Sequence, residues 1–274
     1  MADRKLTKQQ VQKFRAFIWR YYRKNRRDLP WRETRDPYKV LVSEIMLQQT
    51  QVERARRYYP KFLKTFPDWQ PLAKASLKKI LAVWQGMGYN RRVIFLRELA
   101  RKVIKEYRGA LPPDVSDLVK LPGVGKATAG AISAYAFNLP AIFIETNIRR
   151  VFIHKFFSKK NFVHDREIFP LVGQTLDKRN PREWYWALTD YGAMLGKKHG
   201  NPNRKSVHYA KQSAFEGSRR QLRGEVLKLL LKSALTRKQL FAYFPKQKFF
   251  LDPVLSRLHI EGFIKKQGGA YSIR

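Results

Sequence analysis

Two glutamates of this sequence stand in surroundings that suit different steps of acid–base chemistry. Glu44 lies in the run 41–47 (LVSEIML), whose apolar residues cover most of a helix circumference. Because burial disfavours the charged form of a carboxyl group, the sequence predicts a raised pKa for Glu44, as a general acid needs. The alternative is a buried structural glutamate that bonds a neighbouring backbone amide or an arginine.

Glu145 follows the apolar segment 141–144 (AIFI) at the expected start of a helix. A helix N-terminus stabilises negative charge, so we expect Glu145 to be ionised while Glu44 keeps its proton. Cleavage of a glycosidic bond uses such a pair, with a proton for the leaving group and a negative charge for the oxocarbenium-like centre. Helix capping by residues 145–147 is the structural alternative.

Residues 111–138 predict two helices joined by a tight turn at 122–125 (PGVG). Asp114 can cap a first helix that runs through Leu121, and a second helix begins near Lys126. The glycines let the backbone approach a ligand, and the free N–H groups of the second helix form an anion site. This spacing is that of a helix-hairpin-helix element, which binds a DNA phosphate without reading sequence. An ordinary helical turn is the alternative.

The composition points to a polyanionic partner, because the 274 residues carry a net charge of +36. A disordered basic tail is excluded by 44% hydrophobic and 14% aromatic residues. Without an apolar run of about 20 residues or a signal peptide, we expect no membrane partner and a cytoplasmic protein, associated with the nucleoid in a bacterium. The chain has no cysteine, which excludes cysteine-ligated clusters, and its 5 histidines show no metal-ligand spacing.

The expected fold class is mainly α, because apolar residues recur at three- and four-residue spacing, as at Val11, Phe14, Ile18 and Tyr21. We expect a helical domain over 1–196, a basic linker over 197–218 and a small winged-helix-like domain over 219–274. The last domain combines three predicted helices, at 222–231, 236–244 and 252–261, with a hairpin around Gly268 and Gly269. It is equally suited to reading DNA or to docking a protein.

At these residues the chain resembles the adenine DNA glycosylase (MutY) family of the helix-hairpin-helix (HhH-GPD) superfamily, which includes endonuclease III. The match runs from about Arg27 to Met194. The run 46–51 (MLQQTQ) after a glutamate is specific to the adenine branch, whereas the hairpin marks the superfamily alone. The resemblance implies two helical subdomains, base-excision DNA repair, and double-stranded DNA with a mismatch or lesion as the partner.

The resemblance also implies roles for individual residues. Glu44 takes the position of the acid that protonates the departing adenine, and Glu145 stands where the superfamily carries its catalytic aspartate. Its extra methylene shifts the carboxylate from the family position. Gln49 and Tyr89 fall where the family inserts side chains into the base stack. The residues expected to meet DNA are Gln48, Gln49, Tyr89, Arg27, Arg32, Gly123, Val124, Gly125, Lys126, Thr128 and Asn147.

Other positions depart from the family pattern. Its four cluster cysteines would fall at Leu195, Pro202, Lys205 and Lys211, so we expect a clusterless member without a cofactor or metal. Ala127 stands where bifunctional relatives carry a Schiff-base lysine, so we expect weak or no strand-cleaving lyase activity. The winged-helix-like domain replaces the family's usual C-terminal Nudix-like domain, which recognises 8-oxoguanine.

The leading hypothesis is a monofunctional, monomeric glycosylase that removes adenine mispaired with guanine or 8-oxoguanine. One alternative keeps the fold and changes the base to mismatched thymine or uracil, or to a deaminated purine. The departures at Ala127 and Glu145 motivate this alternative. Another is a catalytically silent DNA-binding protein on the same scaffold.

Overall fold

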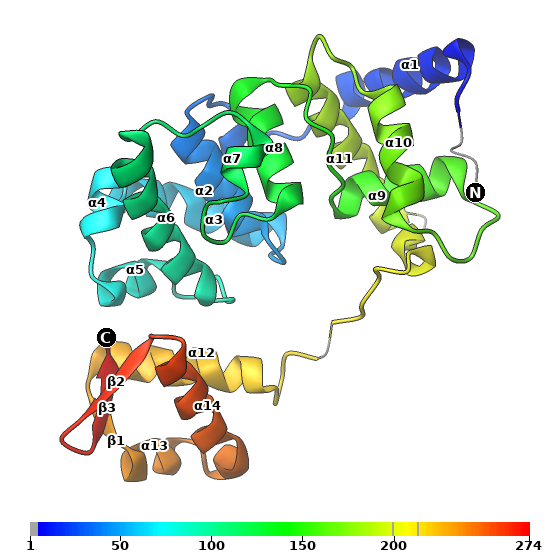
Figure 1. Ribbon diagram of the computed structural model, residues 1–274. Coiled ribbons are helices and arrows are strands. Elements are labelled where there is room, and N and C mark those ends of the chain that lie inside the picture. The colour runs from blue at the N-terminus through cyan, green and yellow to red at the C-terminus, as the bar shows by residue number, and fades with distance from the viewer. Residues whose placement is uncertain (1–4, 199, 213) are drawn as a thin grey trace. The chain divides into compact units, whose positions relative to one another are not determined.

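A computed structural model describes residues 5–198, 200–212 and 214–274 (Figure 1). The chain forms two compact units, each built from two stretches that are distant in sequence. Unit 1 comprises residues 1–44 and 111–210, and unit 2 comprises residues 45–110 and 211–274. The structure is mainly helical, which confirms the expected fold class. Among the described helices, none is long and apolar enough to cross a membrane.

The described residues of unit 1 form helices, loops and an isolated β-bridge between Val163 and Ser206. Its helix α2 continues across the boundary into unit 2. The elements of unit 1 are α1 (Lys8–Asn25), the short 3₁₀ helix η1 (Pro30–Arg32), α2 (Pro37–Leu47), α7 (Val115–Leu118), α8 (Lys126–Phe137), α9 (Thr146–Phe156), α10 (Asp165–Thr175), α11 (Pro181–Lys198) and η2 (Pro202–Lys205).

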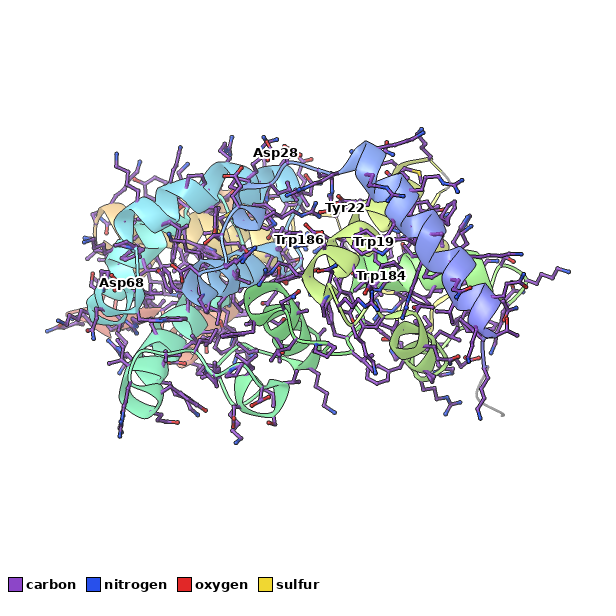
Figure 2. All side chains as sticks on the ribbon, turned by 90° about the horizontal axis from the view of Figure 1, so that it is seen from above. Trp19, Tyr22, Asp28, Asp68, Trp184 and Trp186 are labelled. Carbon is purple, nitrogen blue, oxygen red and sulfur yellow. The ribbon has the colours of Figure 1, made fainter. Side chains whose placement is uncertain are left out.

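The core of unit 1 lies where α11 packs against α1, α8 and α9. Trp184 of α11 is fully buried, and its ring centre lies 5.7 Å from that of Trp19 on α1 (Figure 2). The buried stripe of α1 is Phe14, Ile18 and Tyr22, so Tyr22 takes the place predicted for Tyr21. The prediction was wrong by one residue because both tyrosines satisfy helical spacing, and packing against α11 selects between them.

Helices α9 and α11 approach each other closely at Gly192. A Cβ atom at this position would lie 2.3 Å from the carbonyl oxygen of Asn147, in the first turn of α9. Arg150 crosses the same contact, donating from Nη1 to the Gly192 carbonyl oxygen at 2.8 Å and to Asn147 Oδ1 at 2.9 Å. Because Gly192 has no side chain, α11 can approach the first turn of α9 closely. Glu145 is the N-cap residue of that helix.

Unit 2 joins a helical segment to the C-terminal domain. In the first segment, α6 packs on α4 and α5, and Phe62, Phe66 and Trp84 are buried. The elements of unit 2 after α2 are α3 (Val52–Thr65), α4 (Trp69–Lys74), α5 (Leu77–Trp84), α6 (Arg91–Tyr107), α12 (Arg219–Lys232), β1 (Leu235–Thr236), α13 (Arg237–Tyr243), η3 (Pro245–Gln247), α14 (Lys248–Ile260), β2 (Ile264–Gln267) and β3 (Ala270–Ile273).

The C-terminal domain has the three helices and the hairpin that the sequence predicts. Its antiparallel sheet has the order β1-β3-β2, and Ile264 pairs with Ile273 across the hairpin. Gly268 and Gly269 both have positive φ angles, of 56° and 76°, which the two-residue turn requires. The first and third helices begin three and four residues earlier than predicted. Strand β1 has only two residues, too few for a recognisable pattern.

Candidate active site

Glu44 lies on α2, which begins as the sequence predicts. Pro37 is its first residue, and Asp36 Oδ1 accepts a hydrogen bond from the Tyr38 amide at 2.9 Å. The helical neighbours of Glu44 are buried, and this burial raises its pKa to about 8. The value of about 8 includes a smaller rise from the negative charge of Glu145 and a fall caused by Arg32. Glu44 is therefore protonated at neutral pH, as a general acid needs.

Glu145 is the N-cap residue of α9, so the capping interpretation is confirmed. Its Oε1 accepts hydrogen bonds from the amides of Asn147 and Ile148, each at 2.8 Å, and Oε2 accepts one from Asn147 Nδ2 at 3.2 Å. The expected stabilisation by the helix end is present. Burial nevertheless outweighs it, and the pKa of Glu145 is raised above its usual value. The prediction considered the helix end and not the depth of the site.

Tyr135 on α8 is a third member of this site, and sequence reasoning missed it. Burial raises its pKa well above the usual value, followed by the negative charges of Glu44 and then Glu145. Its ring stacks on Trp186, with centres 6.0 Å apart and planes at 20°. Tyr135 lies in the run 129–136, which is buried throughout and has the pattern of ordinary core. The charges of both carboxyl groups thus reach this tyrosine, and we include it in the candidate site.

A buried ion-pair network adjoins the site. Arg32 Nη2 lies 2.7 Å from Asp190 Oδ1, and Arg32 Nη1 lies 2.8 Å from Asp190 Oδ2. Arg27 donates to the same carboxylate from its Nε at 2.5 Å and from its amide at 3.0 Å. Asp190 is 2% exposed and Arg32 is 7% exposed. The two arginines predicted to meet DNA therefore bind Asp190 in this structure, and their contact with DNA stays a prediction.

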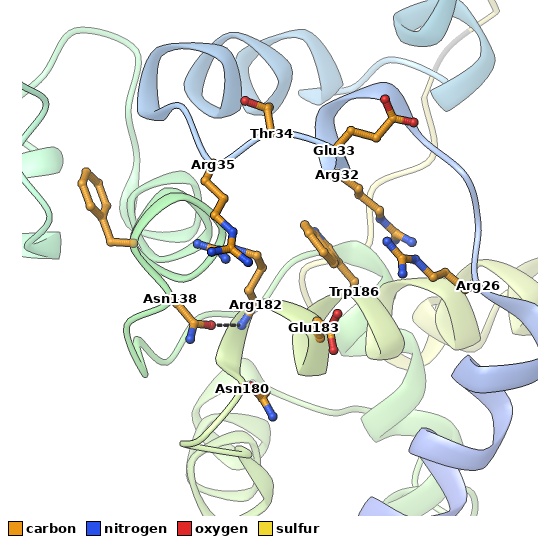
Figure 3. A pocket seen from close by; sticks show the side chains of 11 residues that line it. Arg26, Arg32, Glu33, Thr34, Arg35, Asn138, Asn180, Arg182, Glu183 and Trp186 are labelled. Carbon is orange, nitrogen blue, oxygen red and sulfur yellow. Dashed lines mark hydrogen bonds between the residues drawn. The ribbon is translucent and has the colours of Figure 1, made fainter.

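A pocket of about 610 Å³ borders this network, because Arg32 lines it (Figure 3). It shares Arg32 and Trp186 with the site, but neither Glu44 nor Glu145 lines it. Arg35 and Arg182 bring their guanidinium groups together there, and burial followed by the charge of Arg35 lowers the pKa of Arg182. The Arg182 side chain also donates to the Ala136 carbonyl oxygen at 2.8 Å, at the end of α8 remote from the hairpin.

The hairpin has the geometry that the sequence predicts. Gly123 has a positive φ of 76°, and α8 begins at Lys126 with Gly125 as its N-cap. The exposed Lys126 thus lies at the positive end of a helix of 12 residues. Val124 is 6% exposed, so its side chain points inward. The first helix is shorter than predicted and ends at Leu118 instead of Leu121, because turns occupy the last three residues.

The predicted intercalating residues, Gln49 and Tyr89, belong to unit 2. Their φ angles are 53° and 47°, in the left-handed region that non-glycine residues rarely adopt. Gln49 is exposed, and Tyr89 and Gln48 are half-buried. Strained backbone of this kind is concentrated at functional loops.

Arg92 joins these two loops, and sequence reasoning missed this residue as well. Its Nη1 donates to the carbonyl oxygens of Ile45, Met46 and Gln48 at 3.0, 2.8 and 2.9 Å. Its Nη2 donates to the carbonyl oxygens of residues 87 and 88 at 3.3 and 2.9 Å. Burial lowers the pKa of Arg92 to about 10. One side chain thus connects the end of α2 to the loop before α6, and its basic sequence neighbourhood gives no signal of this role.

The residues at the family's cluster positions do not fit an iron–sulfur cluster. Leu195 is fully buried in the core, and Pro202 and Lys205 lie in η2. Lys211 is exposed. None of these side chains supplies the thiolate that such clusters require.

Hydrogen bonds hold this loop against α9 instead. Asn203 Nδ2 donates to the Thr146 carbonyl oxygen at 2.9 Å. Asn201 Oδ1 accepts from Arg150 Nε at 3.3 Å. Both contacts reach the first turns of α9, next to Glu145. His199 and Ser213, within the predicted linker, lie outside the described residues.

Comparisons with known proteins agree with this fold. Residues 42–169 match the model of the HhH-GPD superfamily base excision DNA repair proteins. The adenine DNA glycosylase of Buchnera aphidicola subsp. Baizongia pistaciae is 37% identical over 64% of this chain and 50% of its own length. The human adenine DNA glycosylase is 35% identical over 68% of this chain and 36% of its own length. The chain thus spans half or less of the length of these relatives.

Solved structures show the same similarity. A thermostable thymine-DNA glycosylase superposes with a TM-score of 0.60 and 28% identity, over 67% of this chain and 86% of its own. Endonuclease III, trapped as a covalent intermediate with DNA, superposes with a TM-score of 0.54 and 24% identity, over 70% of this chain and 86% of its own, which supports the fold alone. The chain thus carries, over residues 42–169 and including the hairpin, an HhH-GPD domain of the base excision DNA repair superfamily.

Proposed function

We propose that this protein is a monofunctional DNA N-glycosylase that removes adenine mispaired with guanine or 8-oxoguanine in double-stranded DNA. The observation that carries the proposal is the pair Glu44 and Glu145: the charge of Glu145 helps to raise the pKa of Glu44, and the amides of α9 bind Glu145. Similarity to adenine DNA glycosylases over about two thirds of the chain supports the choice of base. We also expect a monomer that acts in the cytoplasm.

The proposed chemistry divides between the two carboxyl groups. Glu44, protonated at neutral pH, donates its proton to the adenine ring, because the free adenine anion is a poor leaving group. Glu145, when ionised, stabilises the oxocarbenium-like sugar with its negative charge or orients the attacking water. The hydrogen bonds from Asn147 and Ile148 hold the Glu145 carboxylate in a fixed orientation. The sequence offers no cysteine for a cluster, and the proposed steps require no cofactor.

DNA binding divides between the two units. In unit 1, the hairpin at residues 121–126 presents backbone N–H groups and Lys126 to a phosphate. In unit 2, Gln49 and Tyr89 fill the gap that a flipped nucleotide leaves in the base stack. The net charge of +36 favours the polyanion along the whole contact.

An excision assay with a base panel tests the proposal. Labelled duplexes carry adenine opposite 8-oxoguanine, guanine or thymine, and are treated with alkali after incubation with excess protein. Cleavage at adenine opposite 8-oxoguanine and guanine is expected, and intact strands would overturn the proposal. Omitting the alkali tests the lyase expectation: because Ala127 stands at the lysine position, the strands should stay intact.

A second candidate is a glycosylase for thymine or uracil opposite guanine. The observation that favours it is the similarity in fold to the thermostable thymine-DNA glycosylase. Thymine, uracil and hypoxanthine are therefore included in the panel, and cleavage restricted to one of them would select this candidate. Binding without any cleavage, unchanged by Glu44→Gln, would identify a silent DNA-binding protein.

A further inference from the structure

The side chain of Tyr89 is contacted from the C-terminal part of unit 2. Arg220, the second residue of α12, donates from Nη1 to the Tyr89 hydroxyl at 3.1 Å. The side-chain amide of Gln212, in the segment before α12, donates to the same hydroxyl. The guanidinium carbon of Arg220 lies 5.8 Å from the centre of the Tyr89 ring and 5.4 Å from that of Phe215. We call Tyr89, Phe215 and Arg220 the Tyr89 cluster.

The cluster is open to solvent on one side and fixed on the other. Phe215 is 59% exposed, which is unusual for a phenylalanine in a packed domain. On the buried side, the Arg92 guanidinium carbon lies 5.6 Å from the centre of the Tyr89 ring. The Tyr89 ring therefore has the Arg92 guanidinium, which binds its loop, on one side and the Arg220 guanidinium at its hydroxyl group.

The neighbouring arginines of α12 have partners inside the C-terminal domain. Arg223 donates to Glu261 at 2.7 Å. Arg219 places its guanidinium carbon 5.0 Å from the centre of the Phe250 ring. The capping bond from the Gln221 amide to Ser218 Oγ, at 3.2 Å, fixes the first turn from which Arg220 reaches Tyr89. Arg220 thus differs from its neighbours in contacting the segment that carries the predicted intercalating residue.

Helix α14 exposes two large apolar side chains. In a helix-turn-helix arrangement the second helix enters the major groove, and here that helix is α14. It exposes Phe249 by 94% and Ile260 by 73%, and apolar side chains form no hydrogen bonds with base edges. Its Asp252 is bound to Arg237 at 2.6 Å. The hydrogen-bonding group that the C-terminal domain brings to Tyr89 comes from α12.

We propose that Arg220 and Phe215 form, with Tyr89, a binding site for the guanine-type purine opposite the excised base. The proposal rests on the proposed function, in which Tyr89 enters the base stack. A base next to an inserted Tyr89 lies within hydrogen-bonding reach of a guanidinium that already contacts the tyrosine hydroxyl. The guanidinium fork offers only donors and matches the O6 and N7 acceptors of guanine. The exposed Phe215 ring offers a stacking surface that every base can use.

Equilibrium binding to an uncleavable duplex tests this site without requiring excision. The duplex carries 2′-fluoro-2′-deoxyadenosine opposite guanine, opposite 7-deazaguanine, which lacks the N7 acceptor, or opposite cytosine. Wild-type protein should bind the guanine duplex most tightly. Arg220→Ala should weaken binding to that duplex by about tenfold or more and abolish the difference between guanine and 7-deazaguanine. Phe215→Ala should weaken binding to both of these duplexes equally, because stacking does not depend on N7.

Arg219→Ala is the matched control, because it removes the same charge from the adjacent position and its ring partner is Phe250. It should leave the ratio between the duplexes unchanged. Equal and uniform weakening by Arg219→Ala and Arg220→Ala would reduce Arg220 to a phosphate contact and overturn the proposal. Tighter binding by Arg220→Ala would also overturn it, since the cluster would then hold Tyr89 away from DNA.

The outcome is separable from that of the excision assay. If the wild-type protein excises adenine but Arg220→Ala keeps the guanine preference, this inference alone fails. If no base is excised but the guanine preference depends on Arg220, the proposed function fails and the binding site remains. Circular dichroism and thermal unfolding of each variant show whether its fold is retained.

Discussion

Each of the two units buries an arginine, and the hydrogen-bond acceptors of the two arginines differ. In unit 1, Arg32 faces the carboxylate of Asp190 at 2.7 and 2.8 Å. In unit 2, Arg92 donates to main-chain carbonyl oxygens of two loops, at 2.8 to 3.3 Å. Burial disfavours the charged guanidinium and lowers the pKa of Arg92 to about 10.

The two arginines therefore have different roles: Arg32 acts on the candidate catalytic groups, and Arg92 acts on the backbone conformation of two loops. The Arg32 pair fixes charged side chains beside the carboxyl groups, and Arg32 itself opposes the raised pKa of Glu44. The Arg92 bonds fix where the backbone runs, including the loops that carry Gln49 and Tyr89. Changes in unit 1 should therefore alter the excision step, and changes at Arg92 should alter base extrusion.

Glu44→Gln should give the largest effect and leave unit 2 unaffected. An amide of nearly the same shape has no acidic proton, so the single-turnover excision rate should fall by about 10²- to 10⁴-fold. The dissociation constant for the uncleaved mismatch duplex should change little. Glu53→Gln, the same substitution at an exposed position, should retain full activity. Equal losses of binding and excision would contradict the division.

Asp190→Asn should destabilise unit 1 strongly. It leaves Arg32 buried without an opposite charge, which costs about 3–5 kcal/mol when one partner of a buried pair is removed. Urea unfolding measures the loss. Asp252→Asn provides the control, because its pair with Arg237 is about half exposed and screened by solvent, so its loss should cost little. Similar losses for the two variants would show that burial does not determine the contribution of Asp190.

Arg92→Met should act on the loops more than on the chemistry. Methionine fills similar space but donates no hydrogen bond, and the unsatisfied carbonyl groups should cost about 2–3 kcal/mol in unfolding free energy. Base extrusion, followed by the fluorescence of 2-aminopurine beside the target adenine, should fall, while the pH dependence of excision should not move. Arg91→Met, at the adjacent exposed position, is the control. A shifted pH profile in Arg92→Met would contradict the assigned role.

The pH dependence of excision should be determined by Glu44 in unit 1 and not by residues of unit 2. Since Glu44 acts in its protonated form and has a pKa of about 8, excision should fall about tenfold per pH unit above that value. Between the usual carboxyl pKa and about 8, the folded state holds the Glu44 proton and the unfolded state has lost it. The contribution of Glu44 to the free energy of unfolding is therefore complete below the usual carboxyl pKa. It is lost as the pH rises through about 8. Glu44→Gln should remove this loss, which urea unfolding at pH 5 and pH 9 measures.

Lys126→Ala should give the smallest effect. Loss of one phosphate contact at the hairpin should weaken binding a few-fold on every sequence and reduce the salt slope by about 1. Lys120→Ala is the control, because Lys120 already binds Asp117 at 2.7 Å. Fluorescence anisotropy at several salt concentrations measures both. A change in mismatch preference in Lys126→Ala would show that the hairpin does more than hold a phosphate.

Local features were predictable from the sequence because they depend on neighbours along the chain. Asp36 and Pro37 specify the start of α2, and Gly123 specifies the hairpin turn. The raised pKa of Glu44 follows from apolar residues on its own helix. Each of these depends on a segment of a dozen residues or fewer.

Features that depend on tertiary packing were not predictable from local patterns. The position of Tyr135 beside the carboxyl groups requires knowing how α8 packs, and its own segment resembles ordinary core. Arg92 binds carbonyl groups as far as 47 residues away. The pKa of Glu145 shows both contributions, because its helix end is local and its burial is not. The latter raises the pKa of Glu145 despite the stabilisation by the helix end.

The contact between α9 and α11 makes helix spacing a determinant of acid strength. Alanine is favoured over glycine within a helix by roughly 0.5–1 kcal/mol, yet a methyl group at Gly192 would collide with the Asn147 carbonyl group. The same turn of α9 supplies the amides that bind Glu145. A slightly larger residue at 192 would therefore push the first turn of α9 away from α11. The amides of that turn would move, and the proton affinity of Glu145 would change.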